Sequence, residues 1–262
     1  MGDAILRDAK DGLMTVTLNR PDKLNALSFE SFKGLSAAAD YAAANAASIG
    51  CVLLRGAGRS FCAGNDLGDL GGVFNDGDNS KFRSDTVERL ASLPMPVIAA
   101  VQGHCLTGGL ELALAADIII CAENAKFGDT HGKWDLVPVW GLSQRLPRRI
   151  GRAKALEMSF SARSYSGRQA EAMGLANICV PDAELDSVVH AFVTDVLANS
   201  WRSSRAIKKL VDDTDGMPLK AGLAHEVHRS EGRGPETAER LARMRASGPA
   251  TRAPQHDASK KS

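Results

Sequence analysis

The sequence predicts an α/β fold in which strands alternate with helices and pair largely in parallel. Three apolar runs have the length and composition of buried strands, at residues 51–55, 96–101 and 117–121. Helical patterns separate these runs, near residues 81–92 and 107–116. Because a strand–helix–strand unit crosses over with a right-handed sense, this alternation favours parallel neighbours in one sheet.

Length and composition narrow the class of protein. The 262 residues suffice for one large core, or for one core with a small appendage. Hydrophobic residues make up 44% of the chain and aromatic residues 5%, so the predicted core consists of Ala, Leu, Val and Ile. The 32 basic and 31 acidic residues leave a net charge of +1, and no apolar run reaches the roughly 18 residues that span a bilayer. We therefore expect no nucleic-acid partner and no membrane partner.

The N-terminal elements are predicted to be two strands followed by a long helix. Ile5-Leu6 and residues 13–18 have strand patterns on either side of an Asp11-Gly12 turn. Ser28 is a favourable N-cap residue, and an Ala-rich helical pattern runs from it to about Ala47. No signal-peptide pattern precedes these elements.

The second half of the chain is predicted to be mainly helical. Helices are expected near residues 142–150 and 152–160, and Ser166 caps a further helix that ends at Gly174. A short extended segment at residues 178–181 comes next. Only helical patterns follow it, near residues 183–199, 203–213, 218–230 and 235–246. Residues 247–262 contain almost no apolar side chains, and we expect them to be disordered.

Two glycine-containing turns after predicted strands form the candidate site. One contains Gly108-Gly109, with the carboxylate of Glu111 within the next helical turn, and the other contains Gly64. Glycine lets a backbone turn with its N–H groups exposed, and a helix N-terminus is electropositive. Either turn alone is also consistent with an ordinary connection. Together they can direct two N–H groups at one oxygen beside an acid–base group, which suits acyl or enolate chemistry.

Five scattered cysteines indicate a reducing environment. None belongs to a C-x-x-C pair, and most lie inside apolar runs, so we interpret them as reduced structural thiols of a cytoplasmic protein. Cys62 and Cys105 lie near the candidate site. No His stands beside either in an obvious motif, which favours a packing role over a nucleophilic one.

Taken together, the chain resembles the crotonase (enoyl-CoA hydratase/isomerase) family from Ile5 to about Arg245. Each matching segment is weak alone, and their order and spacing are specific: 19–27, 61–67, 103–113, 116–119, 127–128, 144–147 and 170–175. The resemblance implies a spiral of ββα repeats with a C-terminal helical trimerisation region. It divides the chain into a spiral core with an acyl-CoA site at 1–200, a helical oligomerisation region at 201–246 and a tail at 247–262.

The resemblance also implies a function and a set of site residues. The expected activity is that of an enoyl-CoA hydratase, a lyase acting on an acyl-CoA thioester in a homotrimer or a dimer of trimers. Coenzyme A enters only as part of the substrate, and no other cofactor and no metal site are expected. The oxyanion-hole donors are the backbone N–H groups of Asn65 and Gly108. The substrate-binding positions are Lys23, Ala26, Ala63, Gly64, Asp66, Leu67, Gly109 and Pro138.

Family hydratases use two glutamates, and only the first is present here. The first corresponds to Glu111 and the second to His131. His131 either exchanges a proton near neutral pH or is a polar loop residue without a catalytic role, and Asp129 and Asp135 are close enough in sequence to substitute. This departure leaves three alternatives open: isomerisation, hydrolysis of a thioester or C–C bond, and non-catalytic binding of acyl-CoA.

Two further segments bear on the site. The residues from Asp69 to Ser80 are rich in Gly, Asp and Asn, and we expect them to form a mobile loop over the site. Residues 231–236 lack the Phe and Lys that many family members contribute to coenzyme A binding in a neighbouring subunit. Arg233 or Arg240 is a possible replacement for that phosphate contact.

Overall fold

A computed structural model describes residues 3–66, 68 and 77–246. The expectations for Leu67, for most of the 69–80 loop and for the 247–262 tail therefore fall outside the described residues. The chain divides into two compact units, Met1–Lys208 and Lys209–Ser262. The division falls within the helical region that the sequence places after residue 200.

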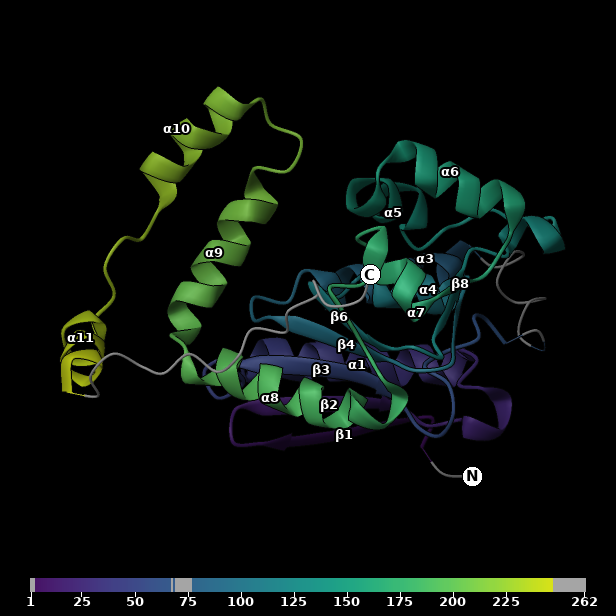
Figure 1. The fold of residues 1–262 in the computed structure, drawn as a ribbon, viewed down its shortest axis with the longest axis horizontal. Coiled ribbons are helices and arrows are strands. Elements are labelled where there is room, and N and C mark those ends of the chain that lie inside the picture. The colour runs from purple at the N-terminus through teal and green to yellow at the C-terminus, as the bar shows by residue number, and fades with distance from the viewer. Residues whose placement is uncertain (1–2, 67, 69–76, 247–262) are drawn as a thin grey trace, which may run out of the picture. The chain divides into compact units, whose positions relative to one another are not determined.

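The larger sheet confirms the prediction of mainly parallel pairing (Figure 1). The two N-terminal strands are antiparallel, and every later neighbour is parallel. The strand order is β1-β2-β3-β4-β6-β9. The strands are β1 (Ile5–Lys10), β2 (Leu13–Leu18), β3 (Cys51–Gly56), β4 (Val97–Val101), β6 (Ile118–Ala122) and β9 (Ile178–Val180).

A second, three-stranded sheet contains β5 (His104–Leu106), β7 (Lys126–Gly128) and β8 (Tyr165–Ser166). The chain alternates between the sheets, because β4 and β6 belong to the larger one and β5 and β7 follow them in the smaller one. This is the spiral that the resemblance implies. The three short strands were not predicted individually, since two or three residues are too few for a periodic pattern.

The helices agree with the predictions in order, and several differ at their ends. Helix α1 (Phe29–Ala44) has Ser28 as its N-cap, as predicted, and Ser31 completes a capping box; the helix ends before Ala47. Helix α3 (Gly77–Ala91) includes Gly77–Ser80, so the loop prediction was wrong for these four residues. A run of Gly, Asp, Asn and Ser is typical of loops and of helix starts alike, and composition does not separate the two.

The remaining helices follow in the expected order. Short 3₁₀ helices lie at η1 (Pro21–Lys23), η3 (His131–Trp134) and η4 (Asp182–Glu184). The α-helices are α4 (Gly108–Ala113), α5 (Leu142–Ile150), α6 (Arg152–Ser161), α7 (Gly167–Ala172), α8 (Leu185–Ala198), α9 (Trp201–Asp213), α10 (Leu219–Arg229) and α11 (Thr237–Ala246). Within the ranges described above, no helix is both long and apolar enough to cross a membrane.

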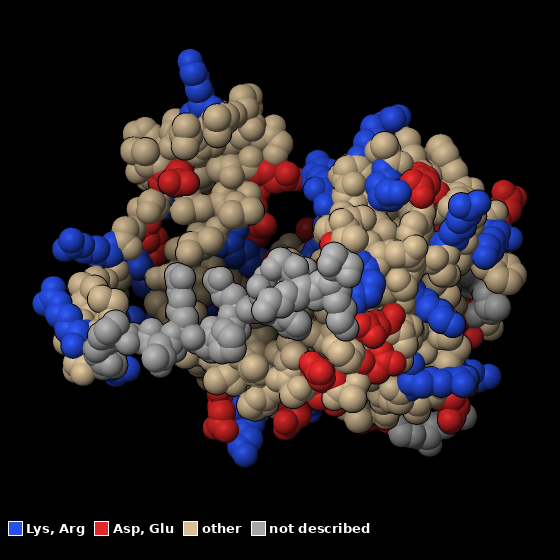
Figure 2. All heavy atoms as spheres, in the orientation of Figure 1, with Lys and Arg blue, Asp and Glu red and all other residues tan. Residues whose placement is uncertain are grey.

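The central parallel strands of the larger sheet, such as β4, are buried on both faces, as expected for parallel strands. Val97, Ala99 and Val101 of β4 belong to the main core with α1, whereas Ile98 and Ala100 face a second cluster that includes residues of α8. This alternation follows from the two-residue period of a strand. On the surface, acidic and basic side chains are interspersed over the face shown in Figure 2.

Candidate active site

Two adjacent parallel strands deliver the central residues of the site. Leu106, the last residue of β5, pairs with Gly128, the last residue of β7. The chain beyond each strand therefore emerges at the same sheet edge. Thr107 makes two hydrogen bonds to the end of the β7 segment. Its N–H donates to the Gly128 carbonyl at 2.9 Å, and its hydroxyl lies 2.6 Å from the hydroxyl of Thr130. As a result, the Gly108 turn and the segment with Asp129 and His131 are adjacent.

The second glycine turn packs directly against the first. Cys62 N–H donates to the His104 carbonyl at 2.8 Å, and Leu106 N–H donates to the Cys62 carbonyl at 3.1 Å. A Cβ on Gly109 would lie 2.3 Å from the Cys62 carbonyl oxygen, so only glycine fits there. A Cβ on Gly64 would lie 3.7 Å from the Gly108 nitrogen. The structure thus brings together the two turns that the sequence singled out.

The backbone amides of Asn65 and Gly108 have no hydrogen-bond acceptor among the residues that the structure describes. Leu27 bonds to the Gly64 carbonyl and to the Asp66 N–H, at 2.8 and 2.9 Å, so the Asn65 N–H faces away from Leu27. Gly108 begins α4, where an N–H has no intrahelical acceptor. Across the described part of the chain, neither amide donates a hydrogen bond to protein. Both N–H groups are free to bind an external oxygen.

Glu111 projects from α4 and is 1% exposed. Its Oε1 accepts hydrogen bonds from the backbone N–H groups of Trp140 at 2.8 Å and Leu142 at 3.4 Å. Its other oxygen, Oε2, lies 3.7 Å from Nε2 of His131. The backbone bonds fix the carboxylate and leave one oxygen facing the imidazole.

His131 is buried and held by a second carboxylate. Oδ1 of Asp129 lies 2.6 Å from its Nδ1 and accepts its backbone N–H at 3.1 Å. Asp135, the other acid considered as a substitute, is exposed, and its backbone caps η3. The structure therefore brings Glu111, His131 and Asp129 together and leaves Asp135 outside the cluster.

The two buried carboxylates have opposite pKa shifts. Burial raises the pKa of Glu111, and His131 and the two backbone N–H donors only partly oppose this effect. Burial also acts to raise the pKa of Asp129, but hydrogen bonds from His131 and Ser159 outweigh it and hold that pKa below the usual range. Asp129 is thus a stable anion, whereas Glu111 takes up a proton more readily than an exposed glutamate.

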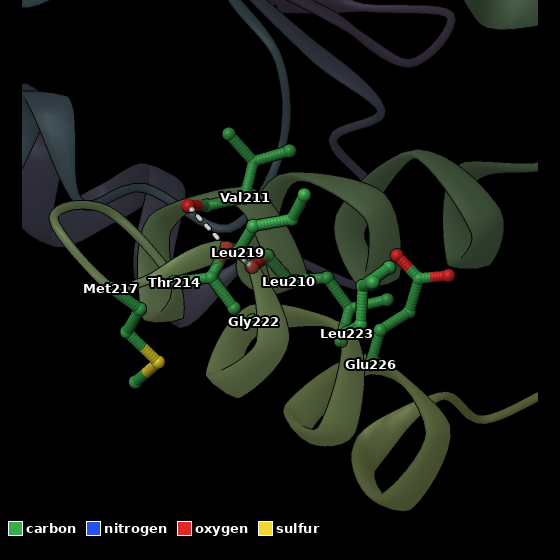
Figure 3. Close-up of a pocket in the computed structure, with 8 residues that line it drawn as sticks. All are labelled: Leu210, Val211, Thr214, Met217, Leu219, Gly222, Leu223 and Glu226. Carbon is green, nitrogen blue, oxygen red and sulfur yellow. Dashed lines mark hydrogen bonds between the residues drawn. The ribbon is translucent and has the colours of Figure 1, made fainter.

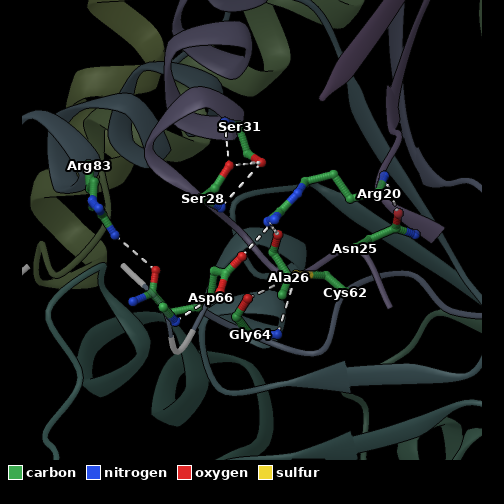
Figure 4. A network of polar contacts seen from close by, with 11 residues as sticks. Arg20, Asn25, Ala26, Ser28, Ser31, Cys62, Gly64, Asp66 and Arg83 are labelled. Atoms are coloured by element: carbon green, nitrogen blue, oxygen red, sulfur yellow. Dashed lines mark hydrogen bonds and ion pairs between the residues drawn. The ribbon is translucent and has the colours of Figure 1, made fainter. Parts of the chain in front are cut away.

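Three of the expected substrate-binding residues, Ala26, Gly64 and Asp66, lie in or next to the second turn (Figure 4). The carboxylate of Asp66 pairs with Arg20 at 2.6 Å, and the same guanidinium donates to the Ala26 carbonyl at 2.6 Å. Ala63 N–H donates to the Leu24 carbonyl at 3.0 Å. This network ties the segment before α1 to the Gly64 turn.

The other expected binding residues are more scattered. Lys23 ends η1 and is exposed. Pro138 is partly buried in the connection between η3 and α5. Leu67 is outside the described residues.

Several residues that shape the site were not predicted from the sequence. Arg20 stands in a matching segment, but no role was assigned to it. Buried Arg83 of α3 donates to the side-chain oxygen of Asn65 at 2.9 Å and stacks near Phe32. Trp140 holds Glu111 through its backbone and packs against Phe32, with ring centroids 4.8 Å apart. No local pattern marks Arg83 or Trp140, since both act through tertiary contacts.

Cys62 and Cys105 have the packing role that the sequence favoured. Both are fully buried, and burial raises the pKa of Cys62 to about 12 and that of Cys105 well above its ordinary value. A thiol that stays protonated is a poor nucleophile. The Cys62 sulfur accepts the Gly64 N–H at 3.4 Å, and the Cys105 thiol donates to the Gly109 carbonyl at 3.5 Å, so both cysteines contact the glycine turns.

A two-sheet spiral with paired glycine turns and a buried acid–base cluster defines an enzyme of the crotonase class. Three comparisons with known proteins agree. The model of the enoyl-CoA hydratase/isomerase family matches residues 8–234. A probable peroxisomal enoyl-CoA hydratase of Arabidopsis thaliana is 35% identical over 84% of this chain and 82% of its own length.

Solved structures extend this agreement to the fold. An enoyl-CoA hydratase from Bacillus anthracis superposes with a TM-score of 0.88 at 31% identity, covering 93% of this chain and 96% of that one. A putative enoyl-CoA hydratase from Thermobifida fusca, solved in complex with acetoacetyl-CoA, gives a TM-score of 0.80 at 25% identity, covering 92% and 96%. The chain belongs to the enoyl-CoA hydratase/isomerase family.

Proposed function

We propose that this protein is an enoyl-CoA hydratase. The observation that carries the proposal is the buried pair of Glu111 and His131, 3.7 Å apart, beside two turns whose amides are free. Names of relatives at about one-third identity support the same reaction, and acetoacetyl-CoA in the Thermobifida fusca protein supports an acyl-CoA ligand. The five buried free thiols fit a cytoplasmic location.

In the proposed reaction, water adds across the Cα–Cβ double bond of an enoyl thioester. The backbone N–H groups of Asn65 and Gly108 stabilise the negative charge that develops on the thioester oxygen. The carboxylate of Glu111 accepts a proton from the attacking water, whose oxygen bonds to Cβ. The imidazolium of His131 donates a proton to Cα. The cluster then holds one proton on Glu111 and none on His131 Nε2, and transfer between them restores the starting state.

A direct assay tests this function. The purified protein is expected to hydrate crotonyl-CoA, which is followed by loss of the ultraviolet absorbance of the conjugated thioester. A parallel screen uses 3-enoyl, β-diketo and saturated acyl thioesters. If the protein turns over only thioesters of this second set, the proposed activity would be isomerisation or hydrolysis and not hydration. Tight acyl-CoA binding without turnover of any thioester would identify a non-catalytic binding protein.

Loss of the Arg20 contact is expected to weaken substrate binding more than catalysis. Arg20→Gln removes the charge-assisted bond to Asp66, and this loosens the segment that carries the proposed coenzyme A contacts. We expect the KM for crotonyl-CoA to rise roughly tenfold, equivalent to about 1.4 kcal/mol, with little change in kcat. The matched control is Arg55→Gln, which breaks the surface pair with Asp186. A fall in kcat at constant KM would contradict this role.

We also propose that the C-terminal helices mediate assembly into a homotrimer or a dimer of trimers. Several of their apolar side chains are exposed, including Leu219, Leu223 and Val227. Figure 3 shows eight residues that line a mainly apolar pocket between α9 and α10. None of the expected site residues lines this pocket. Exposed apolar area of this kind is characteristic of a subunit interface.

Charged substitutions on this surface are expected to produce monomers. The Leu219→Glu/Leu223→Glu double variant places two carboxylates where a second copy would pack, and desolvating them opposes association. Sedimentation velocity measures the outcome. Lys220→Glu, on the same helix at an exposed position, is the control and should assemble like the wild type. A double variant that stays oligomeric would exclude this surface as the principal contact.

A further inference from the structure

The carboxylate of Asp129 is buried beside His131 and is hydrogen-bonded to it. It follows β7 directly, and its Oδ1 binds both the backbone N–H and the ring Nδ1 of His131. The Ser159 hydroxyl approaches the same carboxylate from α6. Asp129 is 2% exposed, so little water competes for these bonds. The carboxylate therefore sets both the turn and the orientation of the ring.

An ionised carboxylate can only accept a hydrogen bond, so the 2.6 Å contact with Asp129 requires a proton on Nδ1 of His131 when Asp129 is ionised. The other ring nitrogen, Nε2, faces Oε2 of Glu111. We propose that Asp129 is a positioning residue that retains the Nδ1 proton of His131, so that Nε2 alone exchanges protons with substrate and Glu111. The catalytic role of Asp129 in this inference rests on the proposed function. The tautomer of His131 does not, because it can be measured whether or not the protein is a hydratase.

The proton balance of hydration depends on this arrangement. When His131 gives its Nε2 proton to Cα, a neutral ring remains with its single proton on Nδ1. That ring presents a lone pair at Nε2, which then accepts the proton that Glu111 took from water. A ring with the opposite tautomer would direct a proton at Glu111 and could not accept one there. Asp129 thus selects the tautomer that allows the next turnover.

A simpler role for Asp129 is to shape the backbone turn through the His131 N–H. The two roles differ in what happens to the ring proton, which ¹⁵N NMR of labelled histidine side chains reports directly. The spectrum of the wild type, with His131→Gln to assign the signal among six histidines, is recorded at a pH where the rings are neutral. We expect the neutral His131 ring to carry its proton on Nδ1.

The variants then separate positioning from folding. Asp129→Ala is expected to shift the proton to Nε2 and to lower kcat about 10²-fold, with KM changed less than about twofold, and the loss should not exceed that of His131→Gln. Asp129→Asn retains an acceptor oxygen and should lose less activity than Asp129→Ala. Asp135→Ala, on the same loop and outside the cluster, should change neither readout.

A wild-type spectrum with the neutral proton on Nε2 would overturn the inference, and this result does not depend on any variant folding. Unchanged tautomer and kcat in Asp129→Ala would overturn it as well. The proposed function fails separately, if the wild type does not hydrate crotonyl-CoA. An Nδ1 proton in an inactive wild type would leave the positioning role of Asp129 intact and remove only its assignment to hydration.

Discussion

Glu111→Gln is expected to lower kcat for crotonyl-CoA hydration by about 10³-fold, because the amide cannot accept the proton of the attacking water. The substitution is nearly isosteric. The amide oxygen can keep the bonds from Trp140 and Leu142, so the backbone around the site should be unchanged. Steady-state kinetics with circular dichroism of the same sample measure the effect. Full retained activity would reject Glu111 as the base.

The same variant is expected to melt at a higher temperature at neutral pH. Burial raises the pKa of Glu111 in the folded protein above its unfolded value, so the folded state binds this proton more tightly. Stability from this group is therefore fully present below the unfolded pKa and is lost as pH rises through the folded one. Gln never ionises and avoids that loss. The gain over wild type should vanish at acid pH, and a melting difference that does not depend on pH would contradict this origin of the gain.

The second large effect is expected from Gly109→Ala. The new Cβ would lie 2.3 Å from the Cys62 carbonyl oxygen, and the two glycine turns must separate to relieve the clash. Misplacing the Gly108 amide should reduce kcat about 10²–10³-fold, the typical effect of losing one oxyanion donor. Overpacking of this kind also destabilises a protein by about 1–3 kcal/mol. Kinetics and denaturant unfolding measure the two consequences.

Gly132→Ala is the matched control for this substitution. Gly132 lies in η3, close to the site in sequence, and a Cβ there would come no nearer than 3.8 Å to its closest neighbour, the Ser159 carbonyl. It should retain near wild-type kcat and stability. Equal losses in both variants would show that any side chain added near the site is harmful, and would remove the specific role of the Cys62 contact.

The fold was predictable wherever a local pattern extends over a whole element. The apolar strands, the Ser28 cap of α1 and the Ser166 cap of α7 are all present. The small sheet was not predictable from periodicity, because strands such as β5 and β7 are stabilised by pairing with each other and not by their own sequence. The loop prediction for Gly77–Ser80 was wrong because polar residues of this kind are typical both of loops and of helix starts.

The sequence motifs of the site were predictable, but the tertiary contacts between its residues were not. The glycine turns and Glu111 are recognisable because two such turns, each after a predicted strand, can direct their N–H groups at one oxygen beside a carboxylate. Sequence placed His131 in the site but left its role open, since only the structure shows Asp129 on one ring nitrogen and Glu111 opposite the other. Arg83 reaches Asn65 from a distant helix, and such a contact has no local signature.

The five buried cysteines can report local unfolding of the regions that contain them. They are distributed over β3, the segment just before Gly64, β5, β6 and β9, and all are buried in the folded protein. An alkylating reagent can reach each sulfur only when the surrounding strands part, so labelling rates follow the opening of individual regions. Mass spectrometry of peptides after timed alkylation would therefore reveal the order in which the spiral comes apart, without any engineered probe.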